Sequence, residues 1–257
     1  MSADRRRWLK GVGASLAGLW LAACDSLTRS KEGRDVLDRA EDLTLRAQRL
    51  VLDRKALARE FGPEHVSTNF RPNGSINPGD PAYAAHRDAG FADWRLVVDG
   101  LVETPLSLSL AELRALPSRS QITRHDCVEG WSDIAKWTGA RLGPLLDQAG
   151  LRSDVRFIVF HCADNLGHTT DPSGLYYESI DLIDAYHPQT ILAYEMNGAA
   201  LPVAHGAPLR LRVERQLGYK HAKYIARKEV AAARKAGPAP DPAACAAEAA
   251  IVAQNPY

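Results

Sequence analysis

Cysteine is the residue type with the widest chemical range in this sequence of 257 residues, and it occurs four times. No two cysteines form a C-x-x-C pair, so neither a zinc ribbon nor a thioredoxin-type motif is indicated. Cys127 has the most informative neighbours, because Arg124 and His125 precede it and are expected to lower the pKa of its thiol. A thiolate can serve as a nucleophile or as a ligand for a soft metal ion. A buried structural cysteine is the third possibility.

The segment around Cys127 is expected to place its sulfur in a cleft. Residues 121–125 predict a strand, and Gly130 lies in the loop that would follow it. A cysteine at the end of a strand, where a glycine-containing loop begins, can project from a rigid scaffold into a site. Composition alone does not choose among the nucleophile, the metal ligand and the structural residue.

The rest of the chain alternates between short strands and short helices. We predict strands over residues 94–98, 121–125, 155–160, 190–194, 208–213 and 223–230. We predict helices over residues 35–60, 139–149 and 179–186, and a long loop over residues 61–91. Because the strands and helices follow no regular βαβ period, they indicate an α+β fold rather than a doubly wound one.

Two local signals add detail to this organisation. Asp99-Gly100 follows the first predicted strand and is typical of a hairpin. Ser109 and Glu112 have the spacing of a capping box, in which each side chain bonds the backbone amide of the other residue. The capping box predicts a short helix through Leu116.

The charge balance of the sequence excludes one class of function. Its 32 basic and 31 acidic side chains give a formal net charge of +1. Proteins that bind nucleic acid normally carry a basic surface, so no nucleic-acid partner is expected.

The N-terminus has the pattern of an export signal. Residues 5–7 are arginines, and residues 11–23 form an apolar run that is too short to span a bilayer. This order is typical of a twin-arginine signal, which exports folded proteins and so suits a chain that binds its cofactor in the cytoplasm. The run ends in Leu-Ala-Ala-Cys24, which resembles a bacterial lipobox and predicts lipidation of Cys24. Ordinary cleavage, with an incidental cysteine, is the alternative.

The sequence around Cys127 resembles a known family. Residues 125–131 (HDCVEGW), with residues 137–139 and 142–146, look like the core motif of the sulfite-oxidase superfamily of molybdopterin-dependent oxidoreductases. Within it, the chain is most similar to the bacterial exported branch that includes the periplasmic methionine-sulfoxide reductases. Further blocks follow in the family's order at residues 69–71, 160–162, 187–193, 197–202, 205–213 and 218–223.

This resemblance implies a sulfite-oxidase-type molybdopterin-binding fold and a set of site residues. It implies that Cys127 ligates molybdenum and is the catalytic residue. It also implies that Mo-molybdopterin is bound by Asn69, Phe70, Arg71, Cys162, His205, Arg210, His221, Ala222 and Lys223. Arginine, lysine and backbone amides are the groups that a phosphate such as that of the cofactor prefers.

Several of these residues also have an ordinary structural interpretation. Arg210 and Lys223 could lie on the solvated face of a strand. Asn69 could be a turn residue in its Pro- and Gly-rich segment, and Cys162 a small core residue. His205 could be a loop histidine with a satisfied hydrogen bond.

The family implies an oxygen-atom-transferring molybdenum oxidoreductase on the periplasmic face of the inner membrane. A small-molecule substrate, a membrane-bound haem or quinol-linked electron-transfer partner and a monomeric chain are expected. The arginine-rich pocket of sulfite oxidases is not identifiable, so sulfite is not expected as substrate. The predicted limits are residues 1–24 for the signal, 25–64 for a helical linker, 65–230 for the oxidoreductase domain and 231–257 for an Ala/Pro-rich tail.

Two alternatives to the oxidoreductase stay open at this point. The first is a cysteine hydrolase, with Cys127 as nucleophile and His125 or His161 as base. The second is a membrane-anchored binding protein that has kept the fold and lost the cofactor. The Ala/Pro-rich tail, which departs from the family's pattern, is the reason for considering the second.

Overall fold

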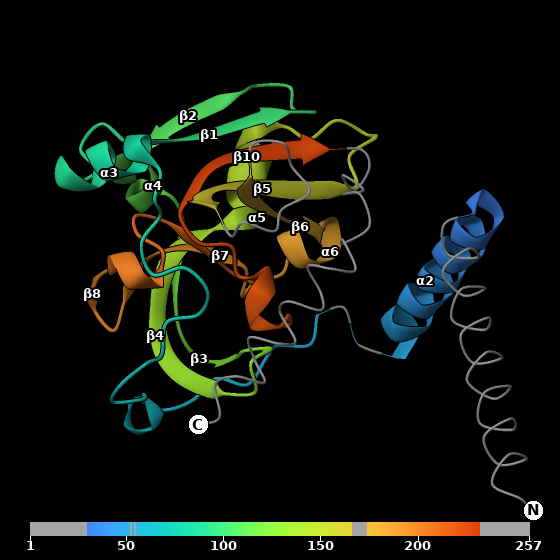
Figure 1. Ribbon diagram of the computed structural model, residues 1–257, viewed down its shortest axis with the longest axis horizontal. Coiled ribbons are helices and arrows are strands. Elements are labelled where there is room, and N and C mark those ends of the chain that lie inside the picture. Colours follow the sequence, from blue (N-terminus) through green and yellow to red (C-terminus); the bar gives the residue numbers. More distant parts are fainter. Residues whose placement is uncertain (1–29, 52, 54, 166–173, 232–257) are drawn as a thin grey trace, which may run out of the picture. The chain divides into compact units, whose positions relative to one another are not determined.

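The structure is a computed structural model, and it describes residues 30–51, 53, 55–165 and 174–231 (Figure 1). By its contacts the chain divides into two compact units, Met1–Ala56 and Leu57–Tyr257. The predicted signal and Cys24, and residues 232–257 of the predicted tail, lie outside the described residues. The limits predicted for the domains stay a prediction.

The described part of the first unit is one helix, α2 (Lys31–Val51). The prediction of a helix over residues 35–60 was right in type but wrong at both ends. The helix begins earlier because the Ser30 hydroxyl accepts a hydrogen bond from the Gly33 amide at 2.9 Å, which is the geometry of an N-terminal cap. It ends earlier, at Val51, and a turn follows in which the Lys55 amide donates to the Asp53 carboxylate at 2.9 Å. None of the described helices is both long enough and apolar enough to cross a membrane.

The second unit contains two five-stranded sheets, and the observed α+β class agrees with the prediction. The first sheet has the order β2-β1-β10-β5-β6, in which only the pair β1–β10 is parallel. Its strands are β1 (Arg95–Gly100), β2 (Leu106–Ser109), β5 (Phe157–Asn165), β6 (Leu175–Asp181) and β10 (Ile225–Ala231). The β1–β2 pair is the hairpin that Asp99-Gly100 predicted.

The second sheet has the order β3-β4-β7-β8, with β9 paired to β7. Its strands are β3 (Ser118–Asp126), β4 (Ser132–Arg141), β7 (Ile191–Met196), β8 (Ala199–Ala200) and β9 (Arg210–Arg212). β3 and β4 form a long, curved hairpin (Figure 1). The turn of this hairpin, between Asp126 and Ser132, is the segment that contains Cys127.

One large apolar core joins the two sheets. It combines fully buried side chains of β1, β5 and β10, such as Leu96, Phe160 and Ile225, with Leu192 of β7 and Leu211 of β9. Helix α5 (Leu142–Ala149) contributes four more buried residues. Burying apolar surface of this extent is the main force that stabilises the domain and fixes the ends of the strands that border the site.

The capping box is confirmed at helix α4 (Leu110–Ala115). The Glu112 amide donates to the Ser109 hydroxyl at 3.2 Å, and the Ser109 amide donates to the Glu112 carboxylate at 2.7 Å. The predicted loop over residues 61–91 contains a further capped helix, α3 (Pro81–Asp88), which was missed. Asp80 caps it by accepting from the Tyr83 amide at 2.7 Å.

Two predicted helices were partly wrong, because pairing between strands overrides local tendency. Residues 139–141 continue β4, and α5 begins only at Leu142. Gly139 suits the strand, because a Cβ there would lie 2.2 Å from the Leu192 carbonyl oxygen on β7. The predicted helix over residues 179–186 is strand β6 up to Asp181, and only α6 (Leu182–Ala185) is helical.

Candidate functional site

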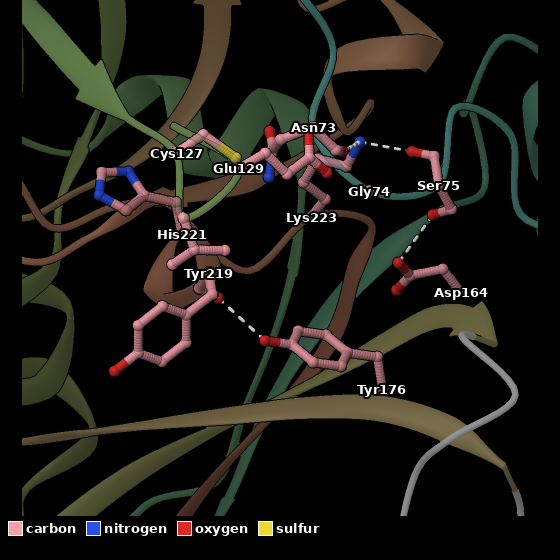
Figure 2. Close-up of a pocket in the computed structure, with 11 residues that line it drawn as sticks. Asn73, Gly74, Ser75, Cys127, Glu129, Asp164, Tyr176, Tyr219, His221 and Lys223 are labelled. Carbon is pink, nitrogen blue, oxygen red and sulfur yellow. Dashed lines mark hydrogen bonds between the residues drawn. The ribbon is translucent and has the colours of Figure 1, made fainter. Parts of the chain in front are cut away.

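A cavity of about 200 Å³ opens beside the turn of the β3–β4 hairpin (Figure 2). It is lined by Asn73, Gly74, Ser75, Cys127, Val128, Glu129, Asp164, Tyr176, Tyr219, His221 and Lys223. Cys127 follows β3 directly and is held by the turn: its amide donates to the Trp131 carbonyl at 2.9 Å, and its carbonyl accepts from the Gly130 amide at 3.1 Å. The expectation that strand β3 delivers Cys127 to a cleft is therefore met.

The Cys127 thiol does not have the lowered pKa that its neighbours suggested. Burial and the Glu129 carboxylate raise the pKa of the thiol above its usual value. Arg124 pairs with Asp126 at 2.8 Å instead. His125 is fully buried, and burial together with Arg212 lowers its pKa to about 2, so it brings no positive charge to the sulfur.

Two buried arginines of β9, Arg210 and Arg212, both lie against the Trp137 ring. Their guanidinium carbons are 4.9 Å and 4.5 Å from the ring centroid. Arg212 is fully paired, because Glu214 accepts from its Nη2 at 2.6 Å and from its Nε at 2.9 Å. Arg210 donates only Nη1, to the His205 carbonyl at 3.0 Å, and its Nε and Nη2 are buried without a partner among the described residues.

Arg210 therefore does not lie on a solvated strand face, because no part of its surface is exposed. Burial and the charge of Arg212 lower the pKa of Arg210 to about 9. A buried guanidinium that leaves two of its donor nitrogens unpaired is costly unless an anion supplies the missing hydrogen bonds.

Lys223 is a third buried cation, and it lines the cavity directly. Its Nζ donates to the carbonyl oxygens of Asn73 and Ala204, at 2.7 and 3.0 Å, and to that of Ser75. Burial and Arg210 lower the pKa of Lys223 to about 7. Gly206 makes this packing possible: its φ is +109°, and a Cβ there would lie 2.9 Å from Cβ of Lys223.

Three buried histidine nitrogens around the cavity have no hydrogen-bond partner within the described ranges. His125 Nδ1 lies 3.0 Å from Arg212 Nη1, which can only donate, so the proton of the neutral ring is on the unpaired Nε2. His221 Nε2 faces the Gln216 carbonyl at 3.1 Å, which leaves Nδ1 as an unpaired acceptor. The third is Nδ1 of His205. Burial lowers the pKa of all three rings, that of His205 to about 4.

The depressed histidine pKa values predict that the cofactor-free protein loses stability in acid. His205 is neutral in the folded state down to about pH 4 but binds a proton in the unfolded state below about pH 6.5. Between these values the unfolded state binds more protons, so the free energy of unfolding falls as the pH falls. His205→Gln should reduce that slope by at most about 1.4 kcal/mol per pH unit.

Urea unfolding of the cofactor-free protein between pH 4 and pH 7 measures this effect. The variant of the exposed His65, His65→Gln, is the matched control and should follow the wild-type slope. An unchanged slope in His205→Gln would show that the His205 ring is not kept neutral by burial.

The structure brings some of the predicted site residues together and leaves others apart. Cys127, His221 and Lys223 line the cavity. Phe70 is buried next to it, with its ring centroid 5.5 Å from those of both Trp137 and His205. Arg210 bonds the His205 carbonyl, as described above.

The other four predicted residues do not line the cavity. Asn69 and Arg71 are exposed, although Arg71 is close enough for its charge to lower the pKa of Cys127. Cys162 and Ala222 are buried in the large apolar core. Burial raises the pKa of the Cys162 thiol well above its usual value.

Four polar residues of the cavity lie outside the sequence motifs and were missed: Asn73, Ser75, Asp164 and Tyr176. Asp164 and Tyr176 reach it through the pairing of β5 with β6, and β6 was not predicted. Asn73 and Ser75 lie in a segment whose sequence predicts only a loop. The one available signal was that Asp164 lies two residues from Cys162 and so points to the same side of β5.

Comparison with known proteins identifies the family. The family model described as "Oxidoreductase molybdopterin binding domain" matches residues 83–239, which is more than half of the chain. The chain therefore belongs to this family of molybdopterin-binding oxidoreductase domains. The match confirms both the family and the cofactor-binding fold that the motifs around Cys127 predicted.

Similar proteins include two curated relatives and one solved structure. A putative protein-methionine-sulfoxide reductase subunit YedZ1 of Azospira oryzae is 43% identical over 54% of this chain and 49% of its own. The protein-methionine-sulfoxide reductase catalytic subunit MsrP of Xanthomonas axonopodis is 37% identical over 57% of this chain and 47% of its own. The sulfane dehydrogenase SoxCD of Paracoccus pantotrophus matches in structure with a TM-score of 0.49 and 24% identity, over 55% of this chain and 39% of that one. The chain spans about half the length of these curated relatives.

The unpaired polar atoms suit the cofactor of this family. The donors without a partner in the described part of the chain include Nε and Nη2 of Arg210 and Nε2 of His125. The acceptors include Nδ1 of His221, Oδ1 of Asn73 and Oδ1 of Asp164. Molybdopterin offers an anionic phosphate and a ring with both donors and acceptors, and a thiol is a preferred ligand for a soft metal. The residues present therefore fit the group.

Proposed function

We propose that this chain is the cofactor-binding part of a molybdenum-dependent oxidoreductase that transfers an oxygen atom. In this proposal Mo-molybdopterin occupies the cavity, and the Cys127 thiolate is the protein ligand of the metal. When bound, the cofactor would supply a centre that exchanges two electrons and one oxygen atom with a substrate.

The observation that carries this proposal is the chemistry of the cavity wall. A cysteine held in a tight turn lines the same cavity as Lys223, and the incompletely paired Arg210 is close enough for its charge to lower the pKa of Lys223. Arg210 is a buried cation with two unpaired donor nitrogens, and binding of an anion would offset the cost of its desolvation. The raised pKa of Cys127 is compatible with ligation, because a coordinating thiol is deprotonated by the metal itself.

The residues around the cavity would bind different parts of the cofactor. Arg210 would donate hydrogen bonds to the phosphate from Nε and Nη2, and the positive charge of Lys223 would strengthen this binding, supported by His205. His221 would accept a hydrogen bond at its unpaired Nδ1. Phe70 and Trp137 would form the apolar wall that keeps water away from the buried cations. Asn69, Arg71, Cys162 and Ala222 would act through their backbone or through the residues they contact.

The cysteine-hydrolase alternative finds little support in this geometry. A nucleophilic cysteine needs a lowered pKa or an adjacent base. Cys127 has a raised pKa, and the ring of His125 is buried against Arg212.

We further propose methionine sulfoxide, free or within a protein, as the substrate. The names of the similar proteins suggest it, and Val128 and Tyr219 supply apolar surface at the cavity that would suit a thioether side chain, being 63% and 47% exposed. Reduction would convert the sulfoxide, two protons and two electrons into a thioether and water. A haem or quinol-linked membrane subunit would supply the electrons at the periplasmic face of the inner membrane. Lipidation at Cys24 would keep the chain there.

The test is sulfoxide reduction by the full chain, with a reduced viologen as electron donor. Protein from cells supplied with molybdate should reduce methionine sulfoxide, and Cys127→Ser should lower the rate by about a hundredfold or more. Cys245→Ser is the matched control and should retain the wild-type rate. Equal rates in protein from cells grown on molybdate and on tungstate would contradict the proposal, as would an undiminished rate in Cys127→Ser.

A further inference from the structure

Tyr219 is a half-exposed aromatic residue in the wall of the cavity. It lies in a single 3-10 turn, η3 (Gly218–Lys220), which directly precedes His221. Tyr219 is 47% exposed, and its hydroxyl has no hydrogen-bond partner among the described residues. Because no bond fixes the hydroxyl, the position of Tyr219 depends on how its turn is held.

The first side of the turn packs against the end of strand β3. Gly218 approaches the strand so closely that a Cβ at this position would lie 2.6 Å from Nε2 of His125 and 3.1 Å from the Asp126 carbonyl oxygen. A glycine is needed where two segments come this near to each other. Since Asp126 is the residue before Cys127, this contact places Tyr219 at the Cys127 end of the cavity.

The other side of the turn is bound by strand β6 (Figure 2). The Tyr176 hydroxyl donates to the Tyr219 carbonyl at 2.9 Å. Lys220 Nζ donates to the Ser179 carbonyl at 3.1 Å and to the Glu178 carboxylate, and the two charged side chains are only 20% and 12% exposed. Glu178 Oε2 also lies 3.2 Å from the Tyr176 hydroxyl. We call Tyr176, Glu178 and Lys220 the β6 clamp, because together they hold two consecutive residues of the turn.

An aromatic ring on a turn held in this way is a pre-organised apolar surface. The turn is fixed before a ligand arrives, so little conformational entropy remains to be lost on binding. Val128 adds a second apolar surface, because it directly follows Cys127, lines the same cavity and is 63% exposed. A ligand that reacts beside Cys127 and carries an alkyl chain would cover both surfaces and remove them from water.

We propose that Tyr219 is a specificity-determining residue that contacts the alkyl chain of the sulfoxide substrate, and that the β6 clamp positions it. The proposal rests on the function proposed above, because it requires sulfoxide reduction at this cavity. Tyr219 touches the chain of the substrate and not the reacting sulfoxide group, so it contributes to binding rather than to the chemical step. Tyr176 is a positioning residue, which acts through the Tyr219 backbone.

The test measures selectivity between two sulfoxides, with the full chain from molybdate-supplied cells and a reduced viologen as electron donor. Methionine sulfoxide carries the alkyl chain, and dimethyl sulfoxide does not. The ratio of kcat/KM for methionine sulfoxide to that for dimethyl sulfoxide should fall about tenfold or more in Y219A, through a higher KM. Y219F restores the ring and should restore the ratio. Y186A removes another exposed tyrosine, outside the cavity wall, and should keep the wild-type ratio.

Y176F tests the clamp, since it removes only the hydroxyl that bonds the Tyr219 carbonyl. The ratio should fall about two- to tenfold, which is the effect of one hydrogen bond. A merely structural role of either tyrosine would slow both reactions alike, so an unchanged ratio in Y219A or in Y176F overturns the proposal. If Y219A does not accumulate as folded protein, the ratio in Y176F decides. A wild type that reduces neither sulfoxide overturns the proposed function, and this proposal with it.

Discussion

Replacing Arg212 by methionine is expected to destabilise the domain by about 3–5 kcal/mol. Both side chains of the Arg212–Glu214 pair have no exposed surface, and their closest charged atoms are 2.6 Å apart. Without Arg212, the Glu214 carboxylate stays buried with the Gln121 side-chain amide, 2.9 Å away, as its remaining neutral donor. Breaking a buried ion pair by removing one partner leaves an uncompensated charge, and a loss of this size is a large part of a domain's total stability.

Urea unfolding of the cofactor-free protein at pH 7 measures the Arg212 effect. The double variant Arg212→Met/Glu214→Gln is the matched control, because it removes both charges together. It should recover most of the lost stability, since replacing a whole buried pair is often close to neutral. If the double variant is as unstable as the single one, the loss comes from packing against Trp137 and not from the orphaned carboxylate.

Replacing Arg210 by methionine should have the opposite pattern: little or no loss of stability, but a large loss of cofactor. Arg210 makes a single hydrogen bond, to the His205 carbonyl, and two of its buried nitrogens have no partner among the described residues. Its removal therefore takes away an uncompensated charge. We expect the free energy of unfolding of the cofactor-free protein to change by less than about 1 kcal/mol or to rise.

The cofactor content of Arg210→Met should fall by at least about tenfold, because a hydrogen bond to a charged group contributes about 1.5–3 kcal/mol to binding. Pterin fluorescence after oxidation and elemental analysis of molybdenum measure this content. The comparison with Arg212→Met is direct, since both arginines contact the same tryptophan ring. An Arg210→Met protein that is as unstable as Arg212→Met, or that keeps its pterin, would contradict the assigned role.

The sequence predicted Cys127 more readily than the different roles of Arg210 and Arg212. Cys127 was predictable because its position depends on local features, namely the end of a strand and a glycine-containing turn. The arginines were harder to interpret, because charged residues at alternate positions of a strand usually mark a solvated face. Strand β9 has only three residues and all are buried, so its two faces cannot be distinguished by alternation.

Asp164 and Tyr176 show a different limit. They belong to β5 and β6, and they reach the cavity only because these two strands pair with a register shift between His161 and Asn165. Pairing between distant segments is a tertiary property, and it also turned the first residues of the predicted helix over residues 179–186 into a strand, up to Asp181. The family motifs identified the cofactor, but the position of Asp164 in the cavity wall became visible only in the folded chain.

The central claim, that Cys127 holds the metal of a bound molybdenum cofactor, is tested most directly by X-ray absorption at the molybdenum edge. The samples are the wild type and Cys127→Ser, both produced in cells that make molybdopterin, with Cys245→Ser as control. The account predicts one sulfur ligand fewer around molybdenum in Cys127→Ser than in the other two proteins, or no molybdenum in it at all. The same number of sulfur ligands in all three, or a wild-type protein without molybdenum, would contradict it.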